Sequence, residues 1–216
     1  MLIKICGNTN EGDAMLSSRH GADYLGVIVE HTVSPRSVNL EVAERIHKAL
    51  LERDVQTPLV AVTVNLPLSH LLLIRQSFKP EVFQLHGDED PECVSELVDR
   101  GARVWATCGD GVDPRARIGS LLDAGAEAIV VDARAKRPDG QTVYGGTGRT
   151  SNWDLARELS DSGVKVVLSG GLNPMNVTSA ILATNPWMVD AVSSLEAMPG
   201  VKDGPKVRAF IEAIRK

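Results

Sequence analysis

The strongest constraint on the fold is a rhythm along the whole chain, in which a short apolar run is followed by a segment with helical spacing of its apolar residues. Eight such units fill the 216 residues, at about 27 residues each. The apolar runs predict strands at 2–5, 23–29, 59–64, 82–85, 103–106, 128–132, 165–168 and 188–192. The segments between them predict amphipathic helices at 11–20, 40–51, 66–77, 91–100, 115–124, 152–160, 174–183 and 205–215.

This alternation favours one architecture. Nearly continuous apolar strands between amphipathic helices are typical of a parallel sheet that helices cover. Eight strand–helix units in a chain of this length predict the α/β class and a single-domain (β/α)8 TIM barrel over residues 1–216. A doubly wound open sheet is the alternative. No linker, charge block or low-complexity stretch points to a second domain.

Composition excludes several classes of function. The net charge of −5 supplies no basic surface for nucleic acid. No apolar run is long enough to cross a bilayer, and no amino-terminal segment reads as a signal peptide. Cys6, Cys93 and Cys108 are odd in number and widely spaced, which predicts a reducing, cytoplasmic location without disulfides. The five histidines never fall at metal-ligand spacing, so we expect no metal site.

The first strand ends in a cysteine that is a candidate for catalysis. Lys4 would mark a wetter point in this strand, and Gly7 stops it directly after Cys6. Asn8 or Thr9 is expected to cap the following helix, which would place the thiol beside a helix amino terminus. Such a setting favours the thiolate, the form in which cysteine acts as a base or nucleophile. The alternative is a small, inert, buried cysteine.

A carboxylate closes the most apolar strand. Active sites of such barrels lie where the carboxyl ends of the strands meet the following loops, so Asp132 and Cys6 would lie on different sides of the barrel mouth. A thiol and a carboxyl separated by the width of a substrate suit proton abstraction on one side and proton donation on the other. The alternative for Asp132 is a structural pair with Arg134 or Lys136.

Further polar groups follow two other strands. Arg36, after the second strand, could bind a substrate carboxylate in bidentate fashion, or it could be a solvated loop residue. Gln84 and His86 end the fourth strand. His86 could stack on the substrate or form a hydrogen bond with it, and a supporting role behind the site is the alternative.

Two clusters suggest a phosphate site. Ser169, Gly170 and Gly171 precede a predicted helix, so backbone N–H groups and the helix dipole could both face an anion. Ser193 and Ser194 follow the last strand, and the loops after strands seven and eight are the recurrent phosphate site of barrel enzymes. The alternative is a tight turn at the glycines and a short capped helix at the serines.

Taken together, these residues resemble the phosphoribosylanthranilate isomerase family of tryptophan biosynthesis, and the similarity runs nearly end to end. The motifs that carry it stand in order on the predicted strand ends. They are Lys4-Ile5-Cys6-Gly7-Asn8-Thr9, Ser34-Pro35-Arg36, Gln84-Leu85-His86-Gly87, Asp132, Gly145-Gly146-Thr147-Gly148 with Trp153, Ser169-Gly170-Gly171-Leu172 and Pro199-Gly200-Val201-Lys202-Asp203.

The resemblance implies a cofactor-free Amadori rearrangement of a small phosphosugar, N-(5′-phosphoribosyl)anthranilate, to 1-(2-carboxyphenylamino)-1-deoxyribulose 5-phosphate, by a monomer or homodimer. On the family's scheme Asp132 protonates the ribose ring oxygen, Cys6 removes the proton from C2, and Arg36 holds the anthranilate carboxylate. The other residues expected to contact the substrate are Gln84, His86, Gly145, Gly146, Ser169, Gly170, Gly171, Ser193 and Ser194.

The sequence departs from the family at Ser194, at Val27 and Val29, and in a long, charge-rich loop between Asp132 and Gly145. Ser194 stands where the family usually has a glycine, so its Cβ would crowd the phosphate if φ had to be positive there. Val27 and Val29 replace phenylalanines and would leave the aromatic substrate a roomier wall. Val27, Val29 and Ser194 motivate one alternative, a paralogous barrel isomerase for another phosphosugar. A non-catalytic phosphosugar-binding protein on the same scaffold is a second alternative.

Overall fold

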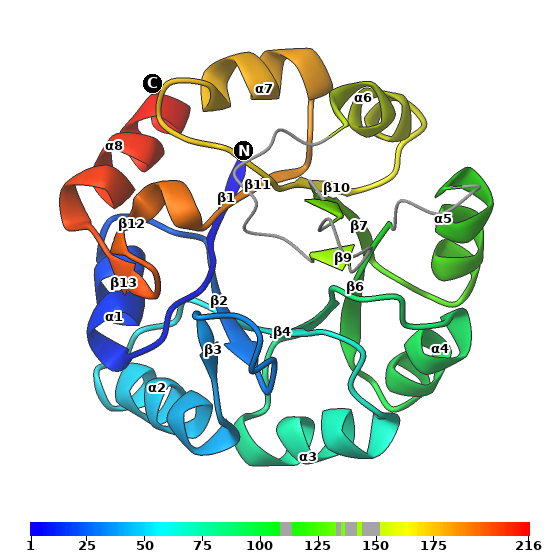
Figure 1. Ribbon diagram of the computed structural model, residues 1–216, viewed down its shortest axis with the longest axis horizontal. Helices are drawn as coiled ribbons and strands as arrows, with labels where there is room; N and C mark the ends of the chain where they lie inside the picture. The colour runs from blue at the N-terminus through cyan, green and yellow to red at the C-terminus, as the bar shows by residue number, and fades with distance from the viewer. Residues whose placement is uncertain (109–113, 133–134, 137–141, 144–151) are drawn as a thin grey trace.

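The parallel strands close into a barrel surrounded by helices (Figure 1). The computed structural model describes residues 1–108, 114–132, 135–136, 142–143 and 152–216. The barrel runs in the order β1-β11-β10-β7-β6-β5-β4-β2, and pairing of β2 with β1 closes it. Its strands are β1 (Leu2–Ile5), β2 (Tyr24–Val29), β4 (Leu59–Thr63), β5 (Val82–Leu85), β6 (Arg103–Thr107), β7 (Ala128–Val131), β10 (Val166–Leu168) and β11 (Met188–Ala191).

A helix follows each barrel strand and covers the outside of the ring. These helices are α1 (Glu11–Arg19), α2 (Leu40–Glu52), α3 (Leu68–Phe78), α4 (Pro91–Asp99), α5 (Pro114–Asp123), α6 (Trp153–Asp161), α7 (Val177–Thr184) and α8 (Gly204–Arg215). The predicted (β/α)8 barrel is therefore confirmed, and the open-sheet alternative is wrong. The largest boundary error is at α7, which begins at Val177 and not at residue 174.

Alternation along the strands divides the core into two layers. Val60, Val62 and Val130 belong to a cluster inside the barrel, where the fully buried Trp105 also lies. The intervening residues, such as Ala61, pack outward against the helices. Because strand side chains point to opposite faces in turn, the position of a residue relative to these valines decides whether it faces the barrel interior.

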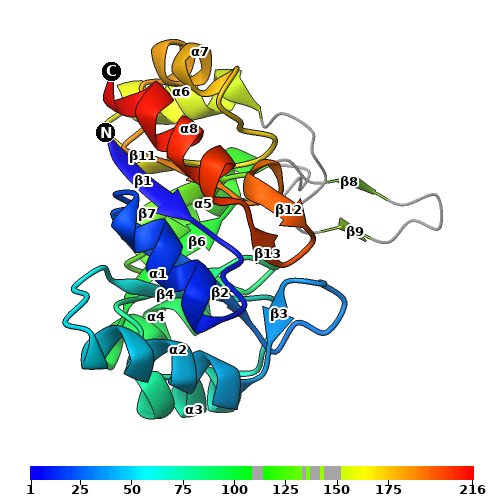
Figure 2. The ribbon, with the colours of Figure 1, turned by 90° about the vertical axis from the view of Figure 1, so that its left-hand side faces the viewer.

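Several short elements that the sequence did not predict lie at one end of the barrel. They follow the carboxyl ends of strands, and Figure 2 shows β3, β12 and β13 at the end away from the two chain termini. They are β3 (Ser37–Val38), β8 (Ala135–Lys136), β9 (Thr142–Val143), the 3-10 turn η1 (Ser193–Leu195), β12 (Glu196–Met198) and β13 (Val201–Lys202). In the part of the chain that the structure describes, no helix is long and apolar enough to cross a membrane.

Candidate active site

A pocket opens at the carboxyl ends of the strands and brings together most of the predicted site residues. The predicted residues that line it are Cys6, Arg36, Gln84, His86, Asp132, Ser169, Gly170, Gly171 and Ser193. Gly145 and Gly146 lie outside the described residues, as does most of the charge-rich loop between Asp132 and Gly145. The described residues contain no group of three or more His, Cys, Asp or Glu side chains arranged to hold a metal ion.

Strand alternation explains why the Cys6 thiol and the Asp132 carboxyl face this pocket. Cys6 belongs to the interior cluster at the end of β1. Asp132 comes two residues after the interior Val130, and His86 comes two residues after Gln84, so each continues the inward face of its strand. The site is therefore the layer of inward-facing residues at the carboxyl ends of the strands. In this layer the side chains of Cys6, His86 and Asp132 are polar, whereas the inward-facing residues deeper in the barrel are mostly apolar.

A hydrogen-bonded chain orients the Asp132 carboxylate. His86 Nε2 lies 3.0 Å from Asp132 Oδ2. The other ring nitrogen, Nδ1, lies 2.9 Å from Gln84 Nε2 and 3.0 Å from Thr107 Oγ1. An amide nitrogen can only donate, so Nδ1 accepts, and the proton of the neutral ring sits on Nε2 and is donated to Asp132. In the described structure His86 therefore orients the Asp132 carboxyl group through a hydrogen bond, and Gln84 orients the His86 ring in the same way.

Cys6 is tightly packed at the end of β1, with 3% of its surface exposed. Its side chain is buried, and burial raises the pKa of the thiol, while the nearby Lys4 ammonium acts to lower it. A Cβ added to Gly26 would lie 2.5 Å from Cys6 Sγ, so only glycine on β2 leaves room for the thiol. The resting side chain is therefore a thiol held in one place, and the expected resting thiolate is not supported.

The loop after Cys6 differs from the expectation. The α1 cap is Asn10, whose side chain accepts a hydrogen bond from the backbone N–H of Asp13, so neither Asn8 nor Thr9 caps this helix. The buried Asn8 amide instead donates to the carbonyls of Ile5 and Gly26, at 2.9 and 3.1 Å. Asn8 thus ties the end of β1 to β2 and fixes the backbone that carries the thiol.

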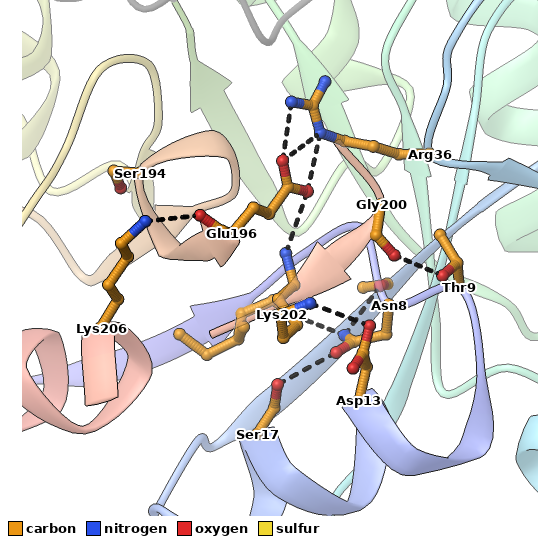
Figure 3. Close-up of polar contacts among 12 residues, drawn as sticks. Asn8, Thr9, Asp13, Ser17, Arg36, Ser194, Glu196, Gly200, Lys202 and Lys206 are labelled. Atoms are coloured by element: carbon orange, nitrogen blue, oxygen red, sulfur yellow. Dashed lines mark hydrogen bonds and ion pairs between the residues drawn. The ribbon is translucent and has the colours of Figure 1, made fainter. Parts of the chain in front are cut away.

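Arg36 reaches the pocket but is already paired. Its Nε lies 2.9 Å and its Nη2 2.8 Å from the two carboxylate oxygens of Glu196 on β12. Both side chains are largely buried, at 13% and 3% exposed, so the alternative of a solvated loop arginine is wrong. Figure 3 shows Glu196 between Arg36 and the buried Lys202.

The predicted phosphate loops come together at one side of the pocket. Gly170 and Gly171 have φ values of 91° and 66°, which favour glycine. Ser193 lines the same pocket from the start of η1. A turn separates the glycines from α7, because Asn176 Nδ2 donates to the carbonyl of Gly171 at 3.0 Å, so the helix does not begin directly at the glycines.

Two of the sequence departures have no effect of the kind expected. Val27 and Val29 belong to the outer layer of the core, and Ile28 between them lines the pocket, so the valines form no wall for a substrate. Ser194 lies in η1, a right-handed turn without positive φ, and its hydroxyl donates to the carbonyl of Leu172 at 2.5 Å. The Cβ of Ser194 therefore causes no backbone strain.

Several residues that shape the site were not predicted. Thr107 ends β6 and Asp190 lies one residue before the end of β11. Each side chain points into the barrel, so applying the alternation of inward and outward residues to these strands would have found both. Gly26 is a glycine inside an apolar strand, a pattern that marks close approach of another group. Glu196 and Lys202 lie in strands of two or three residues, which carry no periodic signal.

Comparisons with known proteins agree with this arrangement. Residues 3–213 match the family described as N-(5′-phosphoribosyl)anthranilate (PRA) isomerase. The N-(5′-phosphoribosyl)anthranilate isomerase of Aquifex aeolicus (strain VF5) is 40% identical over 212 residues, which are 97% of this chain and 96% of that protein. The solved phosphoribosyl anthranilate isomerase of Thermotoga maritima is 34% identical with a TM-score of 0.81, over 100% of this chain and 99% of that one.

A further solved phosphoribosyl anthranilate isomerase, in complex with reduced 1-(o-carboxyphenylamino)-1-deoxyribulose 5-phosphate, is 31% identical with a TM-score of 0.79. It is matched over 100% of this chain and 98% of that one. The match spans the barrel from its first strand to its last helix, in a chain whose pocket holds the thiol and the carboxyl that the motifs predicted. The chain is an isomerase that belongs to the N-(5′-phosphoribosyl)anthranilate isomerase family.

Proposed function

We propose that the chain rearranges N-(5′-phosphoribosyl)anthranilate to 1-(2-carboxyphenylamino)-1-deoxyribulose 5-phosphate in tryptophan biosynthesis, with Asp132 as general acid and Cys6 as general base. The observation that carries this proposal is that both groups line one pocket, which Arg36 and the Gly170-Gly171 loop also line. The pocket thus combines an acid and a base with two anion-binding groups, Arg36 and the Gly170-Gly171 loop. This combination matches a substrate that carries a carboxylate at one end and a phosphate at the other.

The acid step opens the sugar ring. The Asp132 carboxyl donates its proton to the ribose ring oxygen, the C1–O bond breaks, and the anthranilate nitrogen supplies the electron pair that forms a C1=N iminium. The hydrogen bond from His86 holds the carboxyl in one orientation throughout, which supports directed proton transfer. Gln84 and Thr107 contribute by fixing the His86 ring.

The base step follows at C2. The Cys6 thiolate takes the C2 proton, the C–H electron pair forms a C1=C2 bond, and the iminium nitrogen regains its lone pair. The resulting enolamine tautomerises to the ketone. Since burial raises the pKa of Cys6, the cations that favour the thiolate when it is needed are the iminium group next to C2 and the ammonium groups of Lys4 and Lys202.

Substrate binding uses the two ends of the pocket. We assign the anthranilate carboxylate to Arg36 and the phosphate to the backbone around Gly170, Gly171 and Ser193. The hydroxyl of Ser194 is occupied by Leu172, so the contribution of Ser194 is to shape the loop. The substrate contacts of Gly145 and Gly146, the cytoplasmic location and the choice between monomer and homodimer stay predictions.

The other candidate functions lose their motivation. A paralogous isomerase for a different phosphosugar rested on Val27, Val29 and Ser194, none of which alters the pocket as expected. A non-catalytic binding protein would not need Cys6 and Asp132 in the same pocket with a histidine that orients the carboxylate.

The proposal is tested by turnover of N-(5′-phosphoribosyl)anthranilate by the purified chain and by rescue of a tryptophan auxotroph that lacks this isomerase. We expect Cys6→Ala and Asp132→Asn each to lower kcat by roughly a hundredfold or more, the usual contribution of general acid–base groups. Cys93→Ala is the matched control because Cys93 lies half-buried on α4, outside the pocket.

Each result decides a different part of the proposal. No turnover and no rescue by the soluble wild-type chain would refute the substrate. Near-wild-type turnover by Cys6→Ala or by Asp132→Asn, with wild-type turnover intact, would refute the catalytic assignment and leave the substrate standing.

A further inference from the structure

Arg36 lies against the loop that carries the proposed base. A Cβ added to Gly7, next to Cys6, would lie 3.2 Å from Arg36 Cδ, so the arginine stem passes directly over this glycine. The guanidinium has two forked edges of N–H donors. Glu196 accepts from the Nε–Nη2 edge, at 2.9 and 2.8 Å. The Nη1–Nη2 edge is the second fork, of the geometry that suits a carboxylate.

Glu196 is itself firmly held. Its side chain is buried, and the Nζ of the buried Lys202 lies 3.5 Å from its Oε1. Its backbone carbonyl accepts a hydrogen bond from Lys206 Nζ on α8, at 2.7 Å. The two cations and one carboxylate leave a net charge of +1 beside the pocket. Glu196 therefore fixes Arg36 without cancelling the positive charge that an anionic substrate needs.

The β12–β13 hairpin that presents Glu196 is fastened to the loop after β1 and to the first turn of α1. Thr9 Oγ1 donates to the carbonyl of Gly200 at 2.6 Å, and the backbone N–H of Lys202 donates to Asp13 Oδ2 at 3.0 Å. Figure 3 shows these contacts on one side of the hairpin and the Arg36–Glu196 pair on the other. The hairpin thus places the guanidinium and the loop that carries the base in one rigid frame.

We propose that Glu196 is a positioning residue that aims Arg36 at the aryl carboxylate, and that the preference of the enzyme for a carboxylate-bearing aryl group depends on this pair. The inference rests on the proposed function, which assigns the anthranilate carboxylate to Arg36. An arginine loses less entropy on binding when its planar fork is already oriented, so removal of Glu196 weakens recognition although Arg36 keeps its charge.

The test compares two stable ligands by isothermal titration calorimetry. One is reduced 1-(o-carboxyphenylamino)-1-deoxyribulose 5-phosphate, and the other is the same compound with phenyl in place of carboxyphenyl. The readout is the dissociation constant of the phenyl compound divided by that of the carboxyphenyl compound. This ratio reports recognition of the carboxylate alone. In Glu196→Gln this ratio falls by roughly ten- to a hundredfold, the range that a small misplacement costs. Glu212→Gln, an exposed change on α8, keeps the wild-type ratio.

A second variant separates positioning from folding. Glu196→Gln leaves Lys202 buried without its carboxylate, so it can lose stability for that reason alone. Glu196→Gln combined with Lys202→Met removes both charges of this contact and leaves Arg36 without its partner. The same loss of preference is expected in this double variant, with thermal unfolding recorded for every protein.

The outcomes separate the inference from the proposed function. A wild-type ratio in both Glu196 variants, or equal weakening of both ligands, would overturn the positioning role. Loss of the preference in Arg36→Met together with its persistence in the Glu196 variants would leave the proposed function intact and reject only the inference. A wild-type protein that binds neither ligand would reject the proposed function itself.

Discussion

Lys4 and Asp190 form an ion pair inside the barrel, with Nζ 2.7 Å from Oδ2 across the β1–β11 pairing. Lys4 is fully buried, so the expectation of a wetter point in the first strand is wrong. Burial alone would lower the pKa of Lys4, but the adjacent Asp190 carboxylate raises it, and the ammonium stays charged beneath the pocket. The pair holds both charges in place beside Cys6, where the Lys4 ammonium acts to lower the pKa of the thiol and the Asp190 carboxylate acts to raise it.

Removing one partner of this pair should be costly. Lys4→Met leaves a buried carboxylate without its cation, and we expect a loss of about 3–5 kcal/mol in the free energy of unfolding. The measurement is urea unfolding at pH 7. Lys48→Met is the matched control, because Lys48 pairs with Glu52 on the surface and such pairs contribute at most about 1 kcal/mol. Lys4→Met combined with Asp190→Asn should recover most of the loss, and equal stability of Lys4→Met and wild type would contradict the prediction.

The pKa of Cys6 predicts how activity depends on pH. Burial raises this pKa, so the thiolate fraction of the free enzyme is small at neutral pH and grows as the pH increases. Because the proposed mechanism also needs a protonated Asp132, the slope is measured on the residual kcat/KM of Asp132→Asn, which we expect to increase by about tenfold per pH unit below the pKa of Cys6. The residual activity of Cys6→Ser should lack this slope, since a hydroxyl does not titrate in the same range. A flat profile for Asp132→Asn between pH 7 and 9 would show that Cys6 is already ionised.

Gly26 provides the space that Cys6 occupies. A methyl group there would lie 2.5 Å from Sγ and 3.0 Å from the backbone Cα of Cys6, so Gly26→Ala must displace the thiol. Overpacking of this kind costs about 1–3 kcal/mol of stability, and turnover should fall further because the thiol moves. Gly119→Ala is the control, since nothing lies within 4 Å of its added Cβ on α5.

The same clash can be tested in a cycle of variants measured by chemical unfolding. Gly26→Ala should cost less stability in a Cys6→Ala background, where Sγ is absent, than in the wild type. An equal cost in both backgrounds would place the strain elsewhere.

The fold was predictable because its signal is local. Each barrel strand is an apolar run and each helix an amphipathic segment, and both patterns are visible without knowledge of the partner. The predicted start of α7 was wrong because the Asn176 side chain stabilises a turn after Gly171, and this turn replaces the first residues of the expected helix. The β12–β13 hairpin was missed because its stability comes from Thr9 and Asp13, which lie far away in sequence.

The site was predictable where it follows strand ends, and not where it depends on pairing. Strand ends identified Cys6 and Asp132, since topology brings them to one end of the barrel. The burial of Lys4 could not be read from its neighbours, because Asp190 lies 186 residues away. The pairing of Arg36 with Glu196 depends on a contact across 160 residues.

Glu127 stabilises the end of the barrel opposite the pocket. It lies between two cations, with Arg103 Nε 2.8 Å and Lys165 Nζ 2.9 Å from its carboxylate oxygens, and these contacts lower its pKa to about 2 although partial burial acts to raise it. The pKa of an unperturbed glutamate is about 4.3. The folded state therefore holds Glu127 ionised over a range of pH in which the unfolded chain is protonated.

This difference sets the pH window of a fourth prediction. The stabilisation from Glu127 is fully present above about pH 4.3 and is lost as the pH falls towards 2, because a depressed carboxyl pKa favours folding only while the group is ionised. Glu127→Gln should be less stable than wild type at pH 7, and the difference in unfolding free energy should shrink steadily between pH 4.5 and 2. Glu212→Gln, an exposed change, should show no such convergence. A difference that is constant over this range would mean that Glu127 acts through packing and not through its charge.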